Sequence, residues 1–279
     1  MTVEQSRLHA LIVLALAEDI GSGDVTANAT ISDASEGRAE IRAKQNLVLA
    51  GMETLQPVWQ AVDPEVQLNV RAANGDRLTP GSIVAVLDGR VRALLAGERT
   101  CLNFLCHLSG VATNTARYVE AASGTHVQIL DTRKTTPAWR SLEKAAVRAG
   151  GGVNHRMGLY DQILIKDNHV DAAGGIGAAI DRVKRLAPGL RIEVEVRNED
   201  ELAAALLHGA DIILLDNMSL EQIRRAVEVT AGRAQLEVSG GVTLEHIAEL
   251  AATGVDRISC GALTHSAPAA DLHMKLVTA

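Results

Sequence analysis

Aromatic residues are rare in this sequence, and their scarcity limits the kind of core that the chain can build. Phe, Trp and Tyr together make up 2% of the 279 residues, whereas hydrophobic residues as a class make up 47%. Ala, Val, Ile and Leu must therefore fill the interior, which is usual where buried parallel strands pack against helices. We expect an α/β fold rather than a β-sandwich.

Cysteine is also scarce, since the chain has only Cys101, Cys106 and Cys260 and no CxxC pair. An odd number without paired spacing is typical of a reducing compartment and argues against a disulfide framework. A zinc site at Cys101, Cys106 and His107 is disfavoured, because a closed site needs a fourth ligand and this spacing matches no standard zinc pattern. We expect a cytoplasmic protein with packed thiols.

The chain has neither an excess of positive charge nor an apolar run of the roughly 18 residues that a membrane-spanning helix needs. Its 27 Lys and Arg are outnumbered by 34 Asp and Glu, which gives a formal net charge of −7. A surface for nucleic acid or anionic membranes needs a basic excess on one face. The apolar stretch 8–17 lacks a basic start and leads into Glu18 and Asp19, so we interpret it as a helix and not a signal peptide. We therefore expect no nucleic-acid and no membrane partner.

Short β-rich runs recur from residue 126 onward, each followed by a stretch with helical spacing. They cover residues 126–130, 162–165, 191–196, 211–215, 235–238 and 256–259. Strand, helix and strand in repetition indicate parallel βαβ units. Six units predict an incomplete, TIM-like (β/α) barrel. An open doubly wound sheet is the alternative, but no GxGxxG motif follows any of these runs.

One helix between these strands can be predicted in detail. Thr136 suits the N-cap, Pro137 the first helical position and Gly150 the end. The loop before this helix is then short and carries the charges of Arg133 and Lys134.

Residues 24–90 have a different pattern of polar and apolar residues. Segments such as "RAEIRA", "EVQLNVRA" and "IVAVLDG" alternate polar and apolar residues, with turns at "ANGD" and "TPG", which predicts antiparallel strands in a separate α+β layer. The stretch 74–89 also looks like the turns of biotinyl or lipoyl carrier modules, but no lysine sits in a tight turn to carry a cofactor. Residues 91–122 read as a helical bridge into the barrel.

Catalytic groups of (β/α) barrels lie where the strands end at their carboxyl side. The residues found there are Asp131, Thr132, Arg133, Lys134, Lys166, Glu195, Asp216, Ser239, Gly240, Gly241, Cys260, Gly261 and Ala262. Each cation alone would usually be a solvated loop charge. Together with Arg156, however, Arg133, Lys134 and Lys166 would repel one another across one pocket unless anions fill it. The substrate should be polyanionic.

The carboxylates and small residues at the strand ends suggest partners for such an anion. Glu193 and Glu195 are two apart on one strand and so share a face, where they could simply pair with the cations. The functional reading is that Glu195 and Asp216 hold sugar hydroxyls or a magnesium-pyrophosphate group. "VSGG" and "SCGA" on the last two strands suit a phosphate bound by backbone N–H groups.

Several long motifs give the chain a resemblance to a known family. They are "EDIGSGDVT" (18–26), "GERTCLNFLCHLSGVAT" (97–113), "DTRKTTP" (131–137), "GGGVNHRMGLYDQILIKDNH" (150–169), "EVEV" (193–196), "LLDNMS" (214–219), "VSGGV" (238–242) and "SCGALTHS" (259–266). The chain resembles quinolinate phosphoribosyltransferase, also called nicotinate-nucleotide pyrophosphorylase (carboxylating). The resemblance implies a type II phosphoribosyltransferase fold: an N-terminal α/β sandwich domain with a helical bridge (1–108), an incomplete α/β barrel (109–267) and a C-terminal segment (268–279) that packs back towards the N-terminal domain.

The same resemblance implies an activity in de novo NAD (pyridine nucleotide) biosynthesis. A pentosyl (glycosyl) transferase of this kind moves the phosphoribosyl group of 5-phosphoribosyl 1-pyrophosphate to quinolinate and releases CO2, giving nicotinate mononucleotide and pyrophosphate. Mg²⁺ is the implied cofactor, held mainly by the substrate pyrophosphate and waters near Glu195 and Asp216; its protein ligands are unknown. A homodimer is implied, with Arg99 entering the neighbouring subunit's site, and higher assembly is left open.

The resemblance also implies roles for individual residues of this chain. Those implied to be catalytic are Lys134, Lys166, Glu195 and Asp216. Those implied to bind quinolinate or the second substrate are Arg99, Thr132, Arg133, Lys134, His155, Arg156, Lys166, Glu195 and Asp216. Those implied to bind the 5′-phosphate are Ser239, Gly240, Gly241, Cys260, Gly261 and Ala262. Glu193 could compete with Glu195, and Arg197 departs from the acidic or neutral residue expected after "EVEV".

Three other functions remain open from the residues. A paralogue of the same fold, such as those of molybdate-transport operons, would share the barrel but not the substrate. A Schiff-base aldolase would also place a lysine, here Lys166, at the end of a barrel strand. A non-catalytic anion-binding protein would need the cations alone. The intact "DTRK" and "NHR" motifs favour quinolinate.

Overall fold

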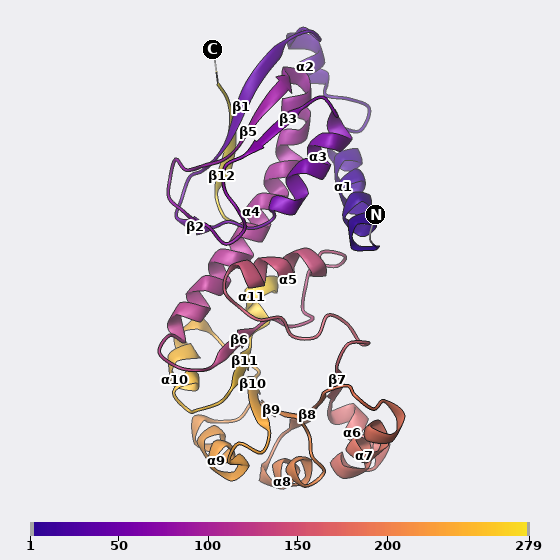
Figure 1. Ribbon diagram of the computed structural model, residues 1–279, viewed down its shortest axis with the longest axis vertical. Coiled ribbons are helices and arrows are strands. Elements are labelled where there is room, and N and C mark those ends of the chain that lie inside the picture. Colours follow the sequence, from indigo (N-terminus) through magenta and orange to yellow (C-terminus); the bar gives the residue numbers. More distant parts are fainter. Residues whose placement is uncertain (1–2, 278–279) are drawn as a thin grey trace. The chain divides into compact units, whose positions relative to one another are not determined.

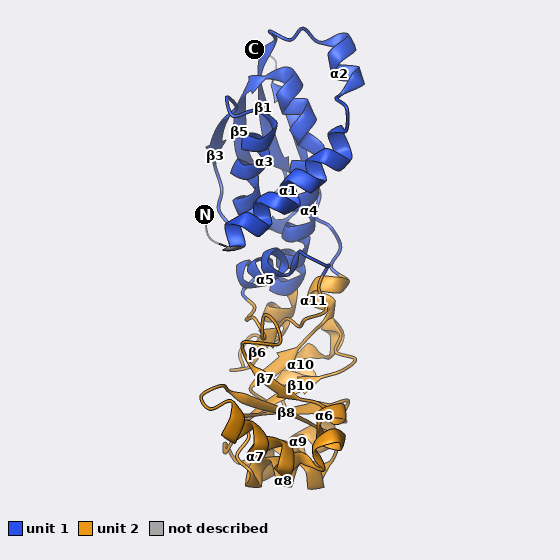
Figure 2. Ribbon diagram, turned by 90° about the vertical axis from the view of Figure 1, so that its right-hand side faces the viewer, with its two compact units in different colours: residues 1–116, 136–151, 267–279 blue, residues 117–135, 152–266 orange. Residues whose placement is uncertain are grey.

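The computed structural model describes residues 3–277, which form two compact units (Figures 1 and 2). The first unit holds the described residues up to 116, residues 136–151 and those from 267 onward; the second holds residues 117–135 and 152–266. The domain boundaries at residues 108 and 267 stay predictions. Residues 278 and 279 of the expected C-terminal segment, and residues 1 and 2 of the expected first domain, lie outside the described residues.

The first unit is built on a four-stranded antiparallel sheet. Its order is β12 (Leu272–Val277), β1 (Glu36–Ala43), β5 (Ile83–Arg90) and β3 (Gln67–Val70), while β2 (Leu47–Val48) and β4 (Arg77–Leu78) form a separate pair. The antiparallel strands expected within residues 24–90 are thus confirmed. Ala39, Ile41 and Ala43 of β1 are buried on alternate positions, so one face of the sheet belongs to the core.

Helices complete the first unit. They are α1 (Val3–Ile20), α2 (Val25–Thr30), the 3-10 turn η1 (Met52–Thr54), α3 (Leu55–Val62), α5 (Arg140–Ala149) and the larger part of α4 (Val91–Ala121). The helices expected at residues 8–17 and 91–122 are therefore confirmed. Trp59 of α3 is fully buried, and a Cβ atom at Gly97 of α4 would lie only 2.3 Å from Cζ3 of its ring. Glycine is needed at this position because α4 approaches the indole so closely.

The predicted start of α5 is wrong by three residues. The helix begins at Arg140, not at Pro137, and Thr136 does not cap it. Ala138 has a left-handed backbone (φ 67°), which interrupts a helix that would start earlier. The N–H of Thr136 instead donates to the buried carboxylate of Glu143 at 3.1 Å, and Glu143 also meets His107 at 2.7 Å. Gly150 ends the helix as expected.

The second unit is built on a six-stranded parallel sheet. Its order is β6 (Gln128–Leu130), β11 (Arg257–Ser259), β10 (Gln235–Ser239), β9 (Ile212–Asp216), β8 (Ile192–Val196) and β7 (Ile163–Ile165). All six predicted strands are confirmed. Within residues 3–277, β6 and β7 each pair with one strand of the sheet and not with each other; β6 also has an isolated bridge from Leu130 to Val153, which lies in the loop before β7. The sheet therefore curves without closing, which confirms the incomplete barrel.

Helices α6 to α10 lie along the outer side of this curved sheet (Figure 1). They are α6 (Asp167–Ala173), α7 (Ile176–Leu186), α8 (Glu199–Leu207), α9 (Leu220–Thr230) and α10 (Ile247–Ala251), the last preceded by the 3-10 turn η2 (Leu244–His246). The short helix α11 (Ala262–His265) follows the carboxyl end of β11. Because every strand of the sheet runs in one direction, all six carboxyl ends meet at the same edge. Among residues 3–277, no helix combines the length and the apolar character that crossing a lipid bilayer requires.

Candidate active site

The polar residues singled out in the sequence lie together at the carboxyl ends of the parallel strands. Asp131 follows β6, Lys166 follows β7, Asp216 ends β9 and Ser239 ends β10. Asp216 and Ser239 are register partners of adjacent strands, so they lie side by side at the edge of the sheet. This edge is where barrel enzymes hold their catalytic groups.

Lys166 and Glu195 form an ion pair at this edge. The Nζ of Lys166 lies 2.7 Å from Oε2 of Glu195, and the two side chains are 47% and 11% exposed. The lysine is further oriented because its backbone N–H donates to Nδ1 of His169 at 3.0 Å. A charge pair that solvent can reach is available to exchange its partners for an anionic substrate.

Glu193 occupies a different environment from Glu195, although both belong to β8. It is fully buried, and its Oε2 accepts a hydrogen bond of 2.6 Å from the amide of Gln162. The same oxygen lies 3.1 Å from Nε2 of His155. Of the two glutamates, Glu195 therefore lies at the open edge of the sheet and Glu193 beneath it.

His155 lies at the centre of a buried ionic cluster that extends across three strands. Its Nε2 is 3.3 Å from Oε1 of Glu237 on β10, and Oε2 of Glu237 is 3.1 Å from Nε of Arg257 on β11. All three residues are at most 9% exposed. We did not predict Glu237 or Arg257. The signal for them is a charged residue within an otherwise apolar strand, in "QLEV" and in "DRIS".

The cluster shifts the ionisation of its members. Burial by itself would lower the pKa of His155, but the Glu193 and Glu237 carboxylates outweigh it and raise that pKa to about 9. Burial likewise opposes ionisation of Glu237, yet His155 and Arg257 hold its pKa below the usual value. One contact acts against the charged imidazole: Nδ1 of His155 accepts the backbone N–H of Arg156 at 2.8 Å and so must lack a proton there.

Two charged loops are tied together by Asp131. Its fully buried carboxylate accepts the backbone N–H of His155 at 2.9 Å and the side-chain amide of Asn154 at 2.5 Å. This fixes the loop before β7, which carries Arg156, to the loop after β6, which carries Arg133. Burial and then the charge of Arg133 lower the pKa of Arg156, as expected for two guanidinium groups in one region.

Lys134 is held by its own loop and by the loop after β11. Its N–H donates to Oγ1 of Thr132 at 3.0 Å, and its carbonyl accepts the hydroxyl of Thr264 at 2.7 Å. A Cβ atom at Gly261 would lie 3.0 Å from both the Cδ of Lys134 and the Nε2 of His265. The aliphatic part of the Lys134 side chain therefore packs against the glycine that was predicted to contact phosphate.

The loop after β10 depends on two glycines. Gly240 and Gly241 have φ values of 96° and 57°, which other residues rarely adopt. A Cβ atom at Gly240 would lie 2.2 Å from Oδ1 of Asn217. Asn217 itself is left-handed (φ 52°), donates its amide to Asp216 at 3.0 Å and its N–H to the Ser239 carbonyl at 3.1 Å. Asn217, which we did not predict, thus links the carboxylate of Asp216 to the glycine loop.

The remaining predicted residues are simply located. Cys260 is buried directly after β11, and burial raises the pKa of its thiol to about 12, so it is an inert packed thiol. Gly261 and Ala262 lead into the short helix α11. Arg99 lies exposed on α4 in the first unit, and its role in a neighbouring subunit stays a prediction.

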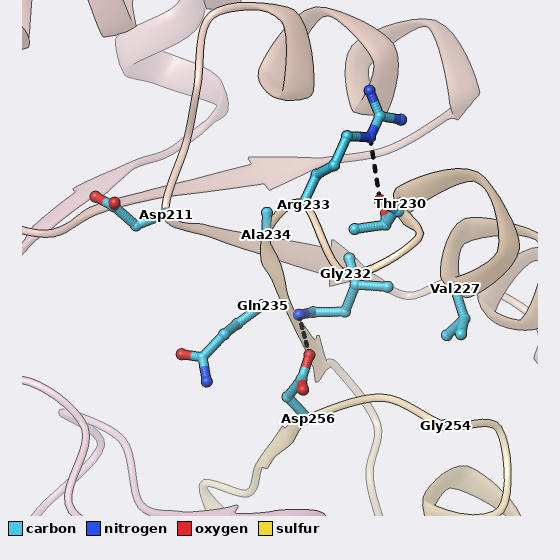
Figure 3. A pocket seen from close by; sticks show the side chains of 10 residues that line it. Asp211, Val227, Thr230, Gly232, Arg233, Ala234, Gln235, Gly254 and Asp256 are labelled. Atoms are coloured by element: carbon cyan, nitrogen blue, oxygen red, sulfur yellow. Dashed lines mark hydrogen bonds between the residues drawn. The ribbon is translucent and has the colours of Figure 1, made fainter.

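A cavity of about 350 Å³ lies at the opposite, amino ends of β9, β10 and β11. Figure 3 shows its lining: Arg233 donates to the carbonyl of Thr230 at 3.1 Å, and Asp256 accepts the N–H of Leu236 at 2.8 Å. Asp211 accepts the N–H of Ile192 at 2.7 Å. These charged side chains therefore satisfy the ends of helices and strands, as is usual at the face of a barrel that serves stability.

Comparisons with known proteins agree on one family. The family model described as "Quinolinate phosphoribosyl transferase, C-terminal domain" matches residues 111–275, and that of the N-terminal domain matches residues 24–109. Nicotinate-nucleotide pyrophosphorylase (carboxylating) of Mycobacterium leprae (strain TN) is 42% identical over 268 residues, with 94% of each chain covered. Quinolinate phosphoribosyltransferase (decarboxylating) 1 of Nicotiana glauca is 37% identical over 291 residues, with 97% of this chain and 83% of the relative covered. The solved nicotinate-nucleotide pyrophosphorylase of Francisella tularensis superimposes with a TM-score of 0.94 at 39% identity, covering 99% of this chain and 98% of that one.

Proposed function

Because this chain belongs to the quinolinate phosphoribosyl transferase family, we propose that it transfers the phosphoribosyl group of 5-phosphoribosyl 1-pyrophosphate to quinolinate and releases CO2. The products are nicotinate mononucleotide and pyrophosphate. The observation that carries the proposal is the charge arrangement at the carboxyl ends of the parallel strands: the charge of Arg133 acts on Arg156, and Lys166 pairs with Glu195 at the same edge of the sheet. Such a cluster of cations requires an anionic partner.

Quinolinate suits these cations, because it carries two adjacent ring carboxylates. Arginine presents a planar fork that binds a carboxylate through two parallel hydrogen bonds. We assign the carboxylates to Arg133 and Arg156, supported by Lys134, His155 and Thr132. Lys166 lies where the two substrates meet, since it is the cation that already pairs with the ribose-facing candidate Glu195.

The transfer forms one bond and breaks another. The ring nitrogen of quinolinate attacks the anomeric carbon of the ribose while the bond from that carbon to pyrophosphate breaks, and the ribose passes through an oxocarbenium-like state. Glu195 and Asp216 stabilise this developing cation, and Lys134 and Lys166 offset the charge of the leaving group. The enzyme otherwise holds both substrates in line.

Decarboxylation follows on the same bound molecule. As the neighbouring carboxylate leaves as CO2, the electron pair of the broken carbon–carbon bond stays on the ring carbon, where the adjacent, positively charged ribosylated nitrogen stabilises it. The ring carbon then takes up a proton from water. Lys134, Arg133 and Arg156 hold the ring while this occurs, and the second ring carboxylate stays in the product.

Mg²⁺ is the cofactor that we propose. It supplies positive charge to the pyrophosphate oxygens when bound. The residues fit this ion, because Glu195 and Asp216 place carboxylate oxygens at the open edge of the sheet, and oxygen is the ligand atom that Mg²⁺ prefers. We propose that pyrophosphate and water hold the ion, with Glu195 and Asp216 accepting hydrogen bonds from that water.

The 5′-phosphate of the ribose is assigned to the loops after β10 and β11. Their members are Ser239, Gly240, Gly241, Cys260, Gly261 and Ala262. The left-handed Gly240 and Gly241 support this assignment, since successive N–H groups in such a loop can point to one anion. Cys260 contributes through its backbone, because its thiol is buried.

We further propose a homodimer that works in the cytoplasm. Arg99 is exposed on α4, as a residue that enters the site of a neighbouring subunit must be. Three free cysteines, Cys101, Cys106 and Cys260, support a reducing compartment.

The test is incubation of the protein with carboxyl-labelled quinolinate, phosphoribosyl pyrophosphate and Mg²⁺. Labelled CO2 and nicotinate mononucleotide should appear together, and their absence would rule the proposal out. Nicotinate and other pyridine carboxylates, offered in parallel, separate it from a paralogue with another substrate. Borohydride trapping with carbonyl compounds should label no lysine; labelling of Lys166 would favour an aldolase instead.

A further inference from the structure

The buried cluster beneath the open edge contains two residues, Glu237 and Arg257, that the proposed chemistry does not use. They are direct register partners on β10 and β11, and each is at most 6% exposed. Although Nε of Arg257 lies 3.1 Å from Oε2 of Glu237, these atoms lack a well-aligned hydrogen bond among the described residues. Their contact is therefore mainly ionic.

A buried ion pair of this kind usually contributes little to the stability of a core. Removing two charges from water often costs more than their attraction returns, so apolar residues of similar volume would usually stabilise the sheet better. Neither oxygen of Glu237 gains a well-aligned hydrogen bond that would offset this cost. Retaining the carboxylate here indicates a task other than stability.

The task follows from what Glu237 contacts. Its Oε1 lies 3.3 Å from Nε2 of His155, while Nδ1 of the same ring accepts the backbone N–H of Arg156 at 2.8 Å. Both ring nitrogens thus have partners: Nε2 contacts the carboxylates, and Nδ1 contacts the backbone of Arg156, the residue that we assign to quinolinate. A displacement of the ring must displace the Arg156 backbone.

We propose that Glu237, held by Arg257, is a positioning residue for the dicarboxylate substrate: it fixes the His155 ring, and the ring holds Arg156 in place. The inference rests on the proposed function. Glu193 on β8 assists from the other side, since its Oε2 is 3.1 Å from the same Nε2. Glu237 acts through His155 and touches no reacting atom.

A bound metal is the alternative for this cluster, because donor atoms of His155, Glu193 and Glu237 lie within 4.8 Å of one another. The protein's own groups already face one another here without an ion: Nε2 of His155 lies 3.1 Å from Glu193 and 3.3 Å from Glu237, and Nε of Arg257 lies 3.1 Å from the second oxygen of Glu237. A divalent cation would also have to lie beside the buried guanidinium of Arg257, which is unfavourable.

Other titratable and charged groups around the ring must enter any account of its pH dependence. They are Glu193 from β8, Glu237 from β10, Arg257 from β11, the neutral thiol of Cys260 after β11, Asp131 after β6 and Arg156 on its own loop. Burial lowers the pKa of His155, but Glu193 and Glu237 outweigh it and raise that pKa to about 9. Removing one carboxylate should therefore lower that pKa.

The experiment compares wild type, Glu237→Gln and the control Glu228→Gln, an exposed ion-pair partner of Arg225 on α9. We expect Glu237→Gln to raise KM for quinolinate about 10- to 100-fold, as displacement of a binding group can. The KM for phosphoribosyl pyrophosphate should stay within about twofold, because the phosphate loops are untouched. The control should match wild type in every respect.

A second readout does not need activity. Titration of ¹⁵N-histidine resonances, with His155 assigned through His155→Gln, should show a pKa near 9 in wild type and a lower value in Glu237→Gln. A wild-type value near 6.5 would overturn the inference even if Glu237→Gln failed to fold. Equal losses for both substrates, or tight binding of Zn²⁺ or Mn²⁺ that depends on Glu237, would also overturn it. Wild type that is inactive with quinolinate would instead refute the proposed function.

Discussion

Lys166 and Glu195 form a 2.7 Å ion pair at the carboxyl ends of the neighbouring strands β7 and β8. The lysine follows β7 directly, and the glutamate belongs to β8, so the sheet itself sets their separation. With the lysine side chain 47% exposed, the pair contributes little to stability, less than about 1 kcal/mol. Its position therefore bears on function more than on folding.

The first prediction concerns this pair. Lys166→Ala should lower kcat about 100- to 1000-fold, the loss typical of one group that stabilises transition-state charge. Thermal unfolding should change little, because the side chain is exposed. Steady-state rates and a melting curve measure both effects.

A matched control for Lys166 is available on the same unit. Arg197 and Glu201 form an exposed pair of the same 2.7 Å length, and neither is assigned to substrate. Glu201→Gln should leave kcat unchanged. A similar loss of activity in both variants would contradict a specific role for Lys166.

The second prediction concerns the glycine loop after β10. Gly240→Ala should destabilise the protein and raise KM for phosphoribosyl pyrophosphate, because the new methyl group would displace Asn217 and with it Asp216. The comparison is Gly189→Ala, whose φ of 91° is close to the 96° of Gly240 but whose Cβ would meet nothing within 4 Å. Both variants bear the left-handed strain of about 1–2 kcal/mol. Kinetics that are equally impaired in both would refute the role of the loop.

The order of strands and the edge that bears the site were predictable because both follow from periodicity. Alternating and continuous apolar runs identify strands, and parallel strands place their carboxyl ends together. Glu195 and Asp216 were accordingly expected at this edge. The start of α5 was not, because the left-handed Ala138 and the contact of Thr136 with Glu143 depend on packing rather than on local preference.

The buried cluster shows where sequence reasoning stops. Glu237 and Arg257 lie 20 positions apart in the chain, and only the pairing of β10 with β11 makes them neighbours. The sequence pattern places Glu193 and Glu195 on one face of a strand but does not tell which lies deeper. The structure shows that Glu193 lies deeper in the sheet, where it contacts His155. Glu195 lies nearer the open edge, where it pairs with Lys166.

The third prediction is a loss of stability as pH rises from about 6.5 to 9. The folded pKa of His155, about 9, exceeds its ordinary value of 6.5, so folding favours the protonated ring. The stabilisation is complete below pH 6.5 and is lost as pH rises through 9, and it amounts to roughly 3 kcal/mol. Urea unfolding at several pH values measures it.

The variant His155→Gln isolates this effect from that of Cys260, whose raised pKa also destabilises the folded state at high pH. The slope between pH 6.5 and 9 should be flatter in His155→Gln than in wild type. His126→Gln, which removes an exposed histidine near Asp256, is the control and should keep the wild-type slope. Parallel slopes in all three proteins would refute the prediction.

The fourth prediction tests the shared site. If Arg99 serves the neighbouring subunit and Lys134 its own, then Arg99→Ala and Lys134→Ala homodimers should both be inactive. A mixed dimer carries both defects in one site and neither in the other. Because random exchange makes half of the dimers mixed, a one-to-one mixture should recover about one quarter of wild-type activity.

The pair Lys134→Ala and Lys166→Ala is the control: both residues belong to the second unit of one chain, so every site of a mixed dimer keeps a defect and no activity should return. Recovery only in the first mixture, with exchange verified by native mass spectrometry, assigns Arg99 to the neighbouring site; equal outcomes in the two mixtures refute that assignment.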